Sequence, residues 1–289
     1  MEIYKIIIWI VIITSIIAII FLYIIIHIKR CIYDILNENI YIAINEDIIY
    51  PKQFDIDTFN TDIFKYLIKL LIDFNSEIMY SCEAISYENI NKIFYISYNK
   101  KPLVKILVDN NNYVWIVIRG TLTYNEFEQD LRISQYELHD NIKCHYGFTD
   151  IYYNIRKELL YILKYINPKY IFGLGHSLGG GILSIASLDL FSAYQNIILY
   201  VTGTPRICNR KFNDIISKYN LYKIENLSDI YINAIPPILP FYNNLSYSKI
   251  GKVIYFDDNR DNIIINHKIE IYYENISKYS ILTNLKLSY

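Results

Sequence analysis

Basic residues are not in excess in this chain of 289 residues. The sequence has 28 Lys and Arg against 29 Asp and Glu, which gives a formal net charge of -1. Proteins that bind nucleic acid neutralise its phosphates with a positive surplus that is missing here, so nucleic acid is not expected as a partner. The chain also lacks a Pro/Gly/Ser-rich linker after residue 50. We therefore expect one large domain rather than two small ones.

Cysteine is scarce as well. The chain has four cysteines: Cys31, Cys82, Cys144 and Cys208. They form no CxxC pair and show no Cys/His spacing typical of zinc, so the sequence predicts no metal site and no cofactor. It leaves open whether these cysteines are free thiols or form disulfides.

N-glycosylation sequons begin at Asn226, Asn244 and Asn275, and they matter only if the domain faces the secretory lumen.

Charged residues are absent from Ile6 to Ile26, a run of 21 positions. At 1.5 Å per residue, a helix of this length covers about 30 Å, the thickness of the hydrocarbon core of a bilayer. We therefore predict a transmembrane helix over about residues 6–26 and an N-terminal membrane anchor over residues 1–30. The alternatives are a cleaved signal peptide, whose apolar region is normally only about 7–15 residues long, and a buried core helix. Lys5 on one side and Lys29 with Arg30 on the other leave the membrane orientation undecided.

The rest of the chain divides into a connector and a catalytic-sized domain. Residues 31–79 are the connector, and an apolar stripe over residues 57–75 predicts a packing helix within it. Residues 80–289 begin with three β-rich runs, and from residue 150 onward helical and buried-strand patterns alternate. This alternation predicts an α/β fold in which a mostly parallel sheet carries helices on both faces.

Glycine is the scarcity that points to a function. Only nine glycines occur, and five of them fall between residues 173 and 181. Gly175, Ser177 and Gly179 form the pattern G-x-S-x-G between an apolar strand pattern and a helix pattern. This is the context of a nucleophile elbow, a sharp turn that exposes a serine hydroxyl and needs glycines where strand and helix approach closely. We predict Ser177 as a nucleophile; the alternative is a glycine-rich helix start without function.

A serine nucleophile needs a base, and α/β-hydrolases place their triad in the chain order Ser, acid, His. The chain has five histidines, and four of them precede Ser177. His267 is the only histidine that follows the serine. It is therefore the predicted base.

The acid of the triad should lie between this serine and this histidine. Asp229 follows a strand-like run, which places it at the carboxyl end of a strand, where open α/β sheets build their sites. Asp257 and Asp258 close another strand pattern and remain alternatives. Asp189 lies twelve residues beyond Ser177, in the helix pattern that follows the elbow. This distance is about 18 Å, which is too far for a triad contact.

Two N–H groups are needed to stabilise the oxyanion of a serine hydrolase. One predicted donor is the amide of Leu178, directly after the nucleophile. The second is Thr121, which follows an apolar strand pattern and can offer both its N–H and its hydroxyl. On its own, Arg119-Gly120-Thr121 is no more than a turn at the end of a strand.

An amphipathic segment follows this turn. Tyr124, Phe127 and Leu131 are spaced i, i+3 and i+7, which predicts one apolar stripe on a short helix. The stripe either packs permanently on the core or acts as a lid that covers the site in water and turns toward lipid at an interface. The sequence leaves both roles open.

These motifs together resemble those of the class 3 (fungal-type) lipases. The matching segments are "IRGTLTYNEFEQDL" (118–131), "HYGF" (145–148), "GHSLGG" (175–180), "TGTPRICNRKF" (202–212), "NLSDIYINAIPPILP" (226–240) and "NHKIEIYY" (266–273). The resemblance covers about residues 80–280 and implies an α/β-hydrolase fold. It implies Ser177 as nucleophile, Asp229 as acid and His267 as base, with an oxyanion hole from Thr121 and Leu178. It also implies a lid between residues 121 and 145.

We therefore predict a single-pass membrane-anchored serine ester hydrolase that cleaves triacylglycerols or phospholipids through an acyl-enzyme. Its expected partners are an acyl-lipid substrate and, through the N-terminal helix, the membrane. An acyltransferase or a protease with the same triad is one alternative. A non-catalytic anchored module that binds lipid or protein is another, although such a module would be expected to lose at least one member of the triad.

Overall fold

The computed structural model describes residues 50–51, 54–80, 85–239 and 245–279. All of them belong to one compact unit, residues 44–289. The predicted anchor, residues 1–30, lies outside the described residues, as do Cys31, Cys82 and Asn244. Within the described ranges, no helix combines the length and the apolar character that crossing a membrane requires.

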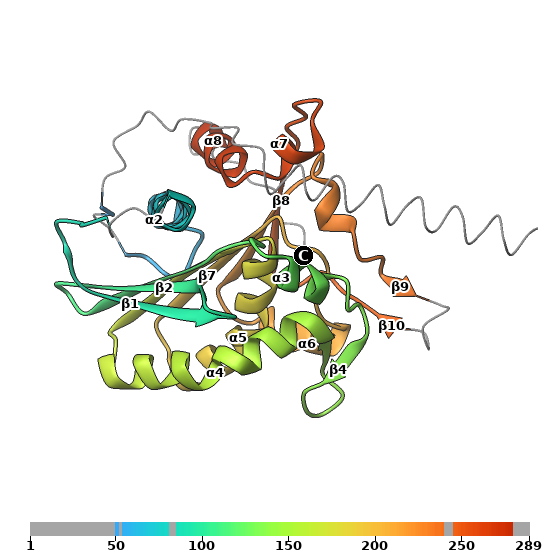
Figure 1. The fold of residues 1–289 in the computed structure, drawn as a ribbon, viewed down its shortest axis with the longest axis horizontal. Coiled ribbons are helices and arrows are strands. Elements are labelled where there is room, and N and C mark those ends of the chain that lie inside the picture. The colour runs from blue at the N-terminus through green and yellow to red at the C-terminus, as the bar shows by residue number, and fades with distance from the viewer. Residues whose placement is uncertain (1–49, 52–53, 81–84, 240–244, 280–289) are drawn as a thin grey trace, which may run out of the picture. The chain divides into compact units, whose positions relative to one another are not determined.

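A seven-stranded sheet forms the centre of this unit (Figure 1), with the strand order β1-β2-β3-β6-β7-β8-β11. Three antiparallel strands occupy one side: β1 (Ile90–Tyr98), β2 (Lys101–Asp109) and β3 (Tyr113–Ile118). Four strands continue parallel to β3: β6 (Tyr170–His176), β7 (Ile197–Thr202), β8 (Leu221–Asn226) and β11 (Lys252–Phe256). The predicted α/β fold with a mostly parallel sheet is thereby confirmed.

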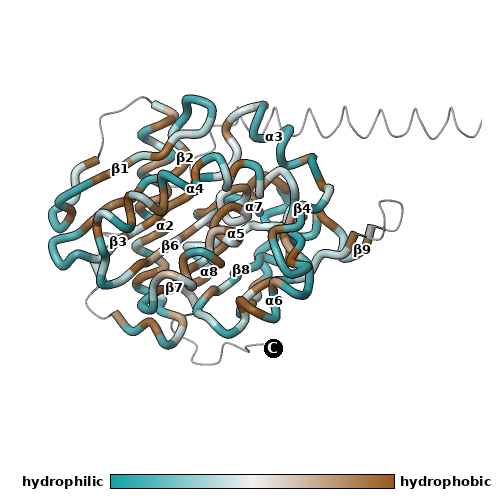
Figure 2. Tube along the Cα trace, turned by 90° about the horizontal axis from the view of Figure 1, so that it is seen from below, coloured by the Kyte–Doolittle hydropathy of each residue, from teal (hydrophilic) through white to brown (hydrophobic). Residues whose placement is uncertain are grey.

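Helices cover both faces of the sheet. α4 (Tyr146–Ile166) and α5 (Leu178–Ala193) pack on one face, and α2 (Thr61–Tyr80) and α8 (Ile269–Tyr279) lie together on the other. Because helices cover both faces of the inner strands, burial does not alternate along them, and all six residues of β7 and all six of β8 are buried. The hydrophobic colour in Figure 2 accordingly follows the strands, while the outer loops are hydrophilic.

The packing helix begins later than the apolar stripe suggested, at Thr61. The reason is the preceding residue, Asn60, whose side-chain Oδ1 accepts hydrogen bonds from the amides of Asp62 and Ile63. Such an N-cap satisfies amides that have no partner within the helix and so marks the start of the helix. Phe59 stays outside α2, but its ring still packs against the rings of Phe64 and Tyr200.

Short elements at the carboxyl ends of the parallel strands carry the candidate site. They are α3 (Tyr124–Asp130), β4 (Gln135–Glu137), β5 (Lys143–His145), α6 (Arg210–Ile216), η1 (Ile230–Asn233), β9 (Ile238–Leu239), β10 (Leu245–Ser246) and α7 (Ile263–His267). β4 pairs with β5, and β9 pairs with β10. The large sheet thus provides the fixed base on which these short segments are arranged.

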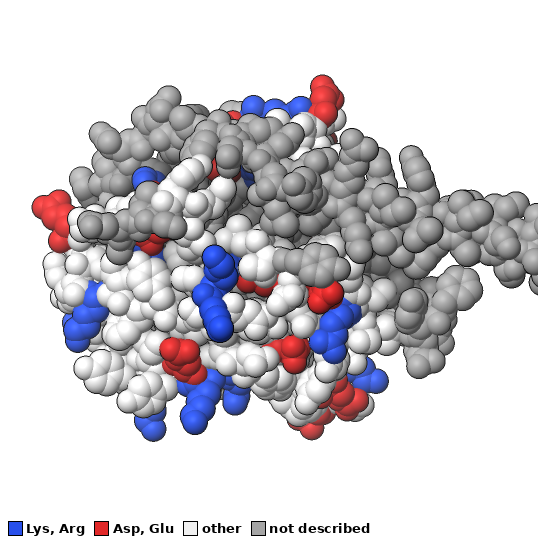
Figure 3. Space-filling view, viewed as in Figure 1, with Lys and Arg blue, Asp and Glu red and all other residues white. Residues whose placement is uncertain are grey.

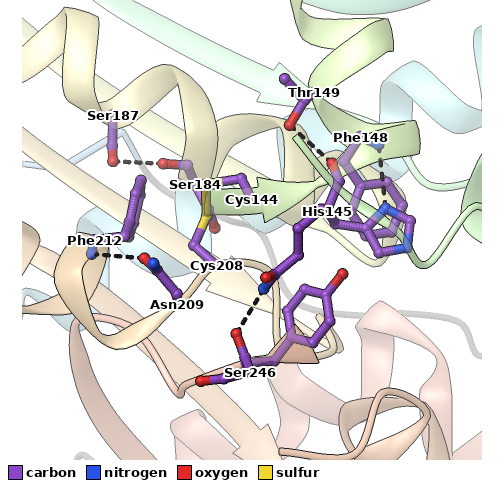
Figure 4. Close-up of a disulfide and its surroundings, with 12 residues drawn as sticks. Cys144, His145, Phe148, Thr149, Ser184, Ser187, Cys208, Asn209, Phe212 and Ser246 are labelled. Atoms are coloured by element: carbon purple, nitrogen blue, oxygen red, sulfur yellow. Dashed lines mark hydrogen bonds between the residues drawn. A yellow bond between two sulfur atoms is a disulfide. The ribbon is translucent and has the colours of Figure 1, made fainter. Parts of the chain in front are cut away.

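A disulfide joins two of the segments around the site. Cys144 in β5 is bonded to Cys208, which lies in the loop after β7 (Figure 4). Both residues are fully buried, and backbone hydrogen bonds pair the same two segments on both sides of the bridge. The sequence had left the state of this pair open, because 64 positions separate the two cysteines.

The described surface carries charges of both signs. On the face drawn in Figure 3, the side chains of Lys and Arg are interspersed with those of Asp and Glu. This mixture agrees with the formal net charge of -1. The face therefore does not resemble the continuous basic surface that phosphate binding requires.

Candidate active site

Ser177 occupies a sharp turn between β6 and α5. Its φ of 54° and ψ of -122° place it in a region that residues with a side chain rarely adopt. The neighbouring glycines make the turn sterically feasible. A Cβ on Gly175 would come within 2.3 Å of the carbonyl oxygen of Gly179, and a Cβ on Gly179 within 2.2 Å of that of Ile118. Strand and helix can therefore approach this closely only with glycine at both positions.

The serine, the histidine and the aspartate predicted from the sequence lie in one hydrogen-bonded chain. The distance from Ser177 Oγ to His267 Nε2 is 2.9 Å. On the other side of the same ring, Nδ1 lies 2.8 Å from Asp229 Oδ2. These are hydrogen-bond distances. The arrangement allows the imidazole to take a proton from the serine hydroxyl while the carboxylate orients the ring.

Asp229 is fully buried, and it keeps its charge through its hydrogen bonds. Besides His267, its carboxylate accepts bonds from the hydroxyl of Tyr272, at 2.7 Å, and from the amide of Tyr231, at 2.9 Å. Burial by itself raises the pKa of Asp229, but the adjacent imidazole and these hydrogen bonds outweigh it, so the pKa lies below its ordinary value. The group is therefore a carboxylate at neutral pH.

The two alternative acids have other partners. Asp257 accepts a hydrogen bond from the hydroxyl of Ser228 at 2.6 Å, and Asp258 forms an ion pair with Arg260. Among the three candidate acids, it is Asp229 whose carboxylate meets the ring of His267.

The rings of Tyr231 and His176 both pack against the imidazole of His267. The ring of Tyr231 has its centroid 4.3 Å from that of His267, and the ring of His176 lies at 4.9 Å. His176 is buried, and its Nδ1 is 3.0 Å from the hydroxyl of Thr202. Burial, together with the nearby His267, lowers the pKa of His176 to about 3. It is therefore neutral at physiological pH and does not repel the positive charge that His267 acquires during catalysis.

The loop of Thr121 and the first residue of α5, Leu178, both adjoin Ser177. A Cβ added to Gly120 would be 3.4 Å from Cβ of Ser177, so the loop before Thr121 touches the nucleophile. Within the described residues, no hydrogen bond from the amide of Thr121 to another group is present. Leu178 is the first residue of α5, and the amides of a first helical turn have no partner within the helix. Both amides can therefore act as donors to an oxyanion.

The hydroxyl of Thr121 is engaged elsewhere, which corrects one expectation. It donates to Oδ2 of Asp130 at 2.8 Å, so in this structure it does not supply a second donor to the oxyanion. The other oxygen of this carboxyl is buried without a partner in the described structure. Burial raises the pKa of Asp130 to about 7. A group that titrates near neutral pH thus lies directly beside the predicted oxyanion loop.

The three lid candidates do not share one environment. Phe127 is buried within α3, whereas Leu131, at the end of this helix, is 54% exposed. Tyr124 begins the helix, and its side chain is outside the described part of the structure. A buried Phe127 fits a closed lid and a permanently packed helix equally well, so the lid stays a prediction.

Several residues of this site were not identified from the sequence. Tyr272, Tyr231 and Asp130 contact the predicted triad or oxyanion residues. The chain has 31 tyrosines, so two more near a histidine do not stand out. In the sequence, Asp130 falls on the polar side of the amphipathic segment, and its contact with Thr121 depends on how α3 folds back.

A comparison with protein families identifies this region. Residues 115–239 match the family model described as lipase (class 3). This region is therefore similar to the class 3 lipases. The match includes the elbow, the loop of Thr121 and Asp229, and it ends before His267. The predicted resemblance to this family is thereby confirmed.

Similar proteins of known sequence are fungal lipases. A lipase from Rhizomucor miehei is 29% identical over 119 residues, which cover 37% of this chain and 33% of that protein. A lipase from Rhizopus niveus is 27% identical over 127 residues, covering 37% of this chain and 32% of that protein. The chain thus matches about a third of the length of these curated relatives.

Solved structures show that the likeness in fold extends further. The triacylglyceride lipase of Rhizomucor miehei superposes with a TM-score of 0.54 over 69% of this chain and 81% of that chain, at 20% identity. A mono- and diacylglycerol lipase from Aspergillus oryzae gives a TM-score of 0.55 over 71% of this chain and 82% of that chain, also at 20% identity. These similarities establish the α/β lipase fold of the domain.

Proposed function

We propose that this protein is a serine ester hydrolase that cleaves acyl lipids. The observation that carries the proposal is the hydrogen-bonded chain Ser177–His267–Asp229 on a nucleophile elbow. The match of residues 115–239 to the class 3 lipase family supports the same chemistry. The similar proteins include a triacylglyceride lipase and a mono- and diacylglycerol lipase.

The reaction proceeds in two steps. Ser177 Oγ attacks the ester carbonyl while His267 takes its proton, and the amides of Thr121 and Leu178 stabilise the oxyanion of the tetrahedral intermediate. The protonated imidazole then returns the proton to the leaving alcohol, which gives an acyl-enzyme. Water, activated by the same imidazole, releases the fatty acid and regenerates the serine. Asp229 orients the imidazole and stabilises its positive charge throughout.

The distribution of exposed aliphatic side chains supports a lipid substrate. Five leucines and isoleucines are each between 48% and 61% exposed: Leu131, Leu227, Ile230, Ile238 and Ile263. Of the described side chains of these two types, no other is exposed to this degree. Elsewhere on the described surface, the large exposed apolar residues are tyrosines and one methionine.

These five residues lie in the segments that carry the site. Leu131 follows α3, Leu227 and Ile230 flank Asp229, Ile263 begins the helix that ends at His267, and Ile238 lies in β9, on the loop after η1. Exposed apolar side chains beside a site favour an interaction with an apolar ligand there. A substrate in an aggregated lipid phase would cover these side chains, whereas a dissolved ester would leave them in water.

We also propose that residues 6–26 anchor the protein in a membrane, as their uncharged run indicates. The disulfide Cys144–Cys208 favours a domain on the oxidising side of that membrane, because such bonds persist there. Two of the sequons would not report this orientation. The amides of Asn226 and Asn275 are buried and donate hydrogen bonds inside the folded domain, so they are inaccessible to a glycan.

The proposed activity is tested with full-length protein in detergent. Triglyceride, phospholipid and a soluble short-chain ester are offered separately, and the released fatty acid is measured with and without an added alcohol acceptor. We expect hydrolysis of at least one acyl lipid, and a Ser177→Ala variant with about a million-fold lower turnover. Transfer of the acyl group to the alcohol in preference to water would instead indicate an acyltransferase.

A folding control keeps this test decisive. The melting temperature of Ser177→Ala should stay close to that of the wild type, because the substitution removes one oxygen atom and leaves the backbone turn unchanged. A folded Ser177→Ala variant that retains wild-type turnover would rule out the proposed mechanism.

A further inference from the structure

A buried ion pair lies directly behind the predicted oxyanion loop. Arg119 follows β3, and both its side chain and that of Glu126 in α3 are fully buried. Two bonds join them in a fork: Nη1 to Oε2 at 2.9 Å and Nη2 to Oε1 at 2.7 Å. The same guanidinium donates to the carbonyl oxygens of Pro102 and Gly120. Arginine is suited to such planar, bidentate contacts.

The carboxylate of Glu126 also binds the backbone of the loop. It accepts hydrogen bonds from the amides of Leu122, at 2.7 Å, and Thr123, at 3.1 Å. In return, the hydroxyl of Thr123 accepts from the amide of Glu126, which completes a capping box at the start of α3. The side chain of one residue in α3 thus holds the segment from Arg119 to Thr123.

Thr121 lies in the middle of this segment. The residues on both sides of it are bound to the ion pair, through the carbonyl oxygen of Gly120 and the amide of Leu122. The amide of Thr121 itself has no acceptor within the described structure. The network therefore fixes the loop on both sides of Thr121 and leaves the N–H of Thr121 available to an oxyanion.

We propose that Glu126, acting through Arg119 and the loop amides, is a positioning residue that holds the oxyanion loop in its catalytic geometry before substrate binds. This inference rests on the proposed hydrolase function. Stability alone gives a weaker reason for the pair, because burying two charges costs solvation that apolar residues of similar size would not lose. Apolar residues could fill the space, but they could not bind the amides of Leu122 and Thr123.

The proposal has a consequence for the lid. Lifting α3 from the domain would withdraw Glu126 from the loop and displace Thr121 at the moment when its amide is needed. The other end of α3 packs closely against α4. A Cβ added to Gly147 of α4 would come within 1.8 Å of the carbonyl oxygen of Gln129 in α3. We therefore infer that α3 keeps its place while the enzyme turns over.

The test compares Glu126→Gln with the wild type, as full-length protein, on a soluble ester. The amide keeps the shape of the side chain but removes its charge and weakens its hold on the loop. We expect kcat to fall by about 10- to 100-fold, somewhat less than the loss from deleting an oxyanion donor outright, with KM little changed. Binding of a boronic acid, whose tetrahedral adduct on Ser177 places an oxygen in the oxyanion hole, should weaken by a similar factor.

A matched control separates positioning from stability. Glu77 in α2 forms a similarly buried ion pair with Lys105 in β2, at 2.6 Å. Glu77→Gln should lower the melting temperature while leaving kcat, counted per titratable serine, and the affinity for the boronic acid unchanged. Should Glu126→Gln behave in the same way, Glu126 would be a stabilising residue only and the proposal would be wrong.

A second variant covers the case in which Glu126→Gln does not fold. Arg119→Lys keeps the charge but loses the fork, and we expect a smaller loss of about five- to ten-fold in kcat, within the range of one weakened hydrogen bond. Wild-type kcat and boronic acid affinity in this variant would overturn the proposal. The proposed function fails in a different way, namely if the wild type shows no turnover that depends on Ser177.

Discussion

At the scale of single residues, the proposed mechanism depends on Asp229 being the acid of the triad. Asp229→Asn leaves the shape of the site intact but no longer stabilises the imidazolium or its correct tautomer, so we expect turnover to fall by about ten-thousand-fold. Asp257→Asn is the matched control, because this exposed residue has Ser228 as its hydrogen-bond partner within the described part of the chain, and it should keep wild-type turnover. A fully active Asp229→Asn would move the acid to Asp257 or Asp258.

Asp130 makes stability depend on pH. Its pKa of about 7 in the folded protein exceeds that of an unfolded aspartate, about 3.9. Between these values the folded state holds the proton more tightly, so the contribution of this group is complete below about pH 4 and is lost as the pH rises through 7. Asp130→Asn cannot titrate and should escape this loss.

Denaturant unfolding at pH 4.5 and pH 8 measures this effect. We expect the free energy of unfolding of Asp130→Asn, relative to the wild type, to rise between the two pH values by roughly 2–4 kcal/mol. A difference that is the same at both pH values would show that Asp130 is already ionised in the folded protein at the lower pH.

At the scale of elements, α3 is the segment on which two hypotheses disagree. As a lid, it would present Phe127 to lipid, so Phe127→Ser would reduce activity on emulsified lipid far more than on a dissolved ester. As a fixed helix held by Glu126, it keeps Phe127 in the packed interior, where its exposed fraction is 7%. The buried Arg119–Glu126 pair leads us to expect the second behaviour.

The measurement is the activity of Phe127→Ser on both substrates, together with its melting temperature. We expect similar losses on both and a destabilisation of about 2–4 kcal/mol, as for other truncations of buried aromatic residues. Leu131→Ser is a useful comparison, since Leu131 is exposed and its loss should hardly affect stability. A selective loss on lipid in Phe127→Ser, with an unchanged melting temperature, would establish α3 as the lid.

The disulfide between Cys144 and Cys208 also acts at the scale of elements. It joins β5 to the loop after β7 across 64 positions, and closing a loop of this length restricts the unfolded chain. The double variant Cys144→Ala/Cys208→Ala should therefore lose about 4 kcal/mol of unfolding free energy. Reductant should destabilise the wild type toward the value of the double variant and leave the variant itself unaffected. A wild type that is insensitive to reductant under unfolding conditions would contradict this.

At the scale of the whole molecule, the anchor and the catalytic domain should be separable. The compact unit that contains the sheet and the site begins at residue 44, so deleting residues 1–30 should yield a fragment with unchanged turnover on a dissolved ester. Fractionation should find the full-length protein in membranes and the fragment in the soluble fraction. Release of full-length protein from membranes by carbonate or high salt alone would argue against a spanning helix.

The sequence alone was sufficient to predict a site residue where the signal lies in neighbouring residues or in the order of residues along the chain. A glycine-dense turn between a strand pattern and a helix pattern pointed to Ser177, and chain order left His267 as the single candidate base, because both inferences need only neighbouring residues or their order. Likewise, strand and helix periodicities predicted the mostly parallel sheet, since burial on two faces dictates the residue pattern of each strand. For Asp229 the sequence left three candidates, all at the ends of strand patterns.

The tertiary structure decided what depends on distance between remote segments. It placed Asp229 rather than Asp257 or Asp258 against the imidazole, paired Cys144 with Cys208, and turned the hydroxyl of Thr121 toward Asp130. It also showed that Glu126 binds Arg119 and the amide of Leu122 in the oxyanion loop. Apart from the capping box of Thr123 and Glu126, which is a local pattern, these contacts have no signature in the sequence. A carboxylate on a helix resembles solvated surface until the fold buries it beside its partner.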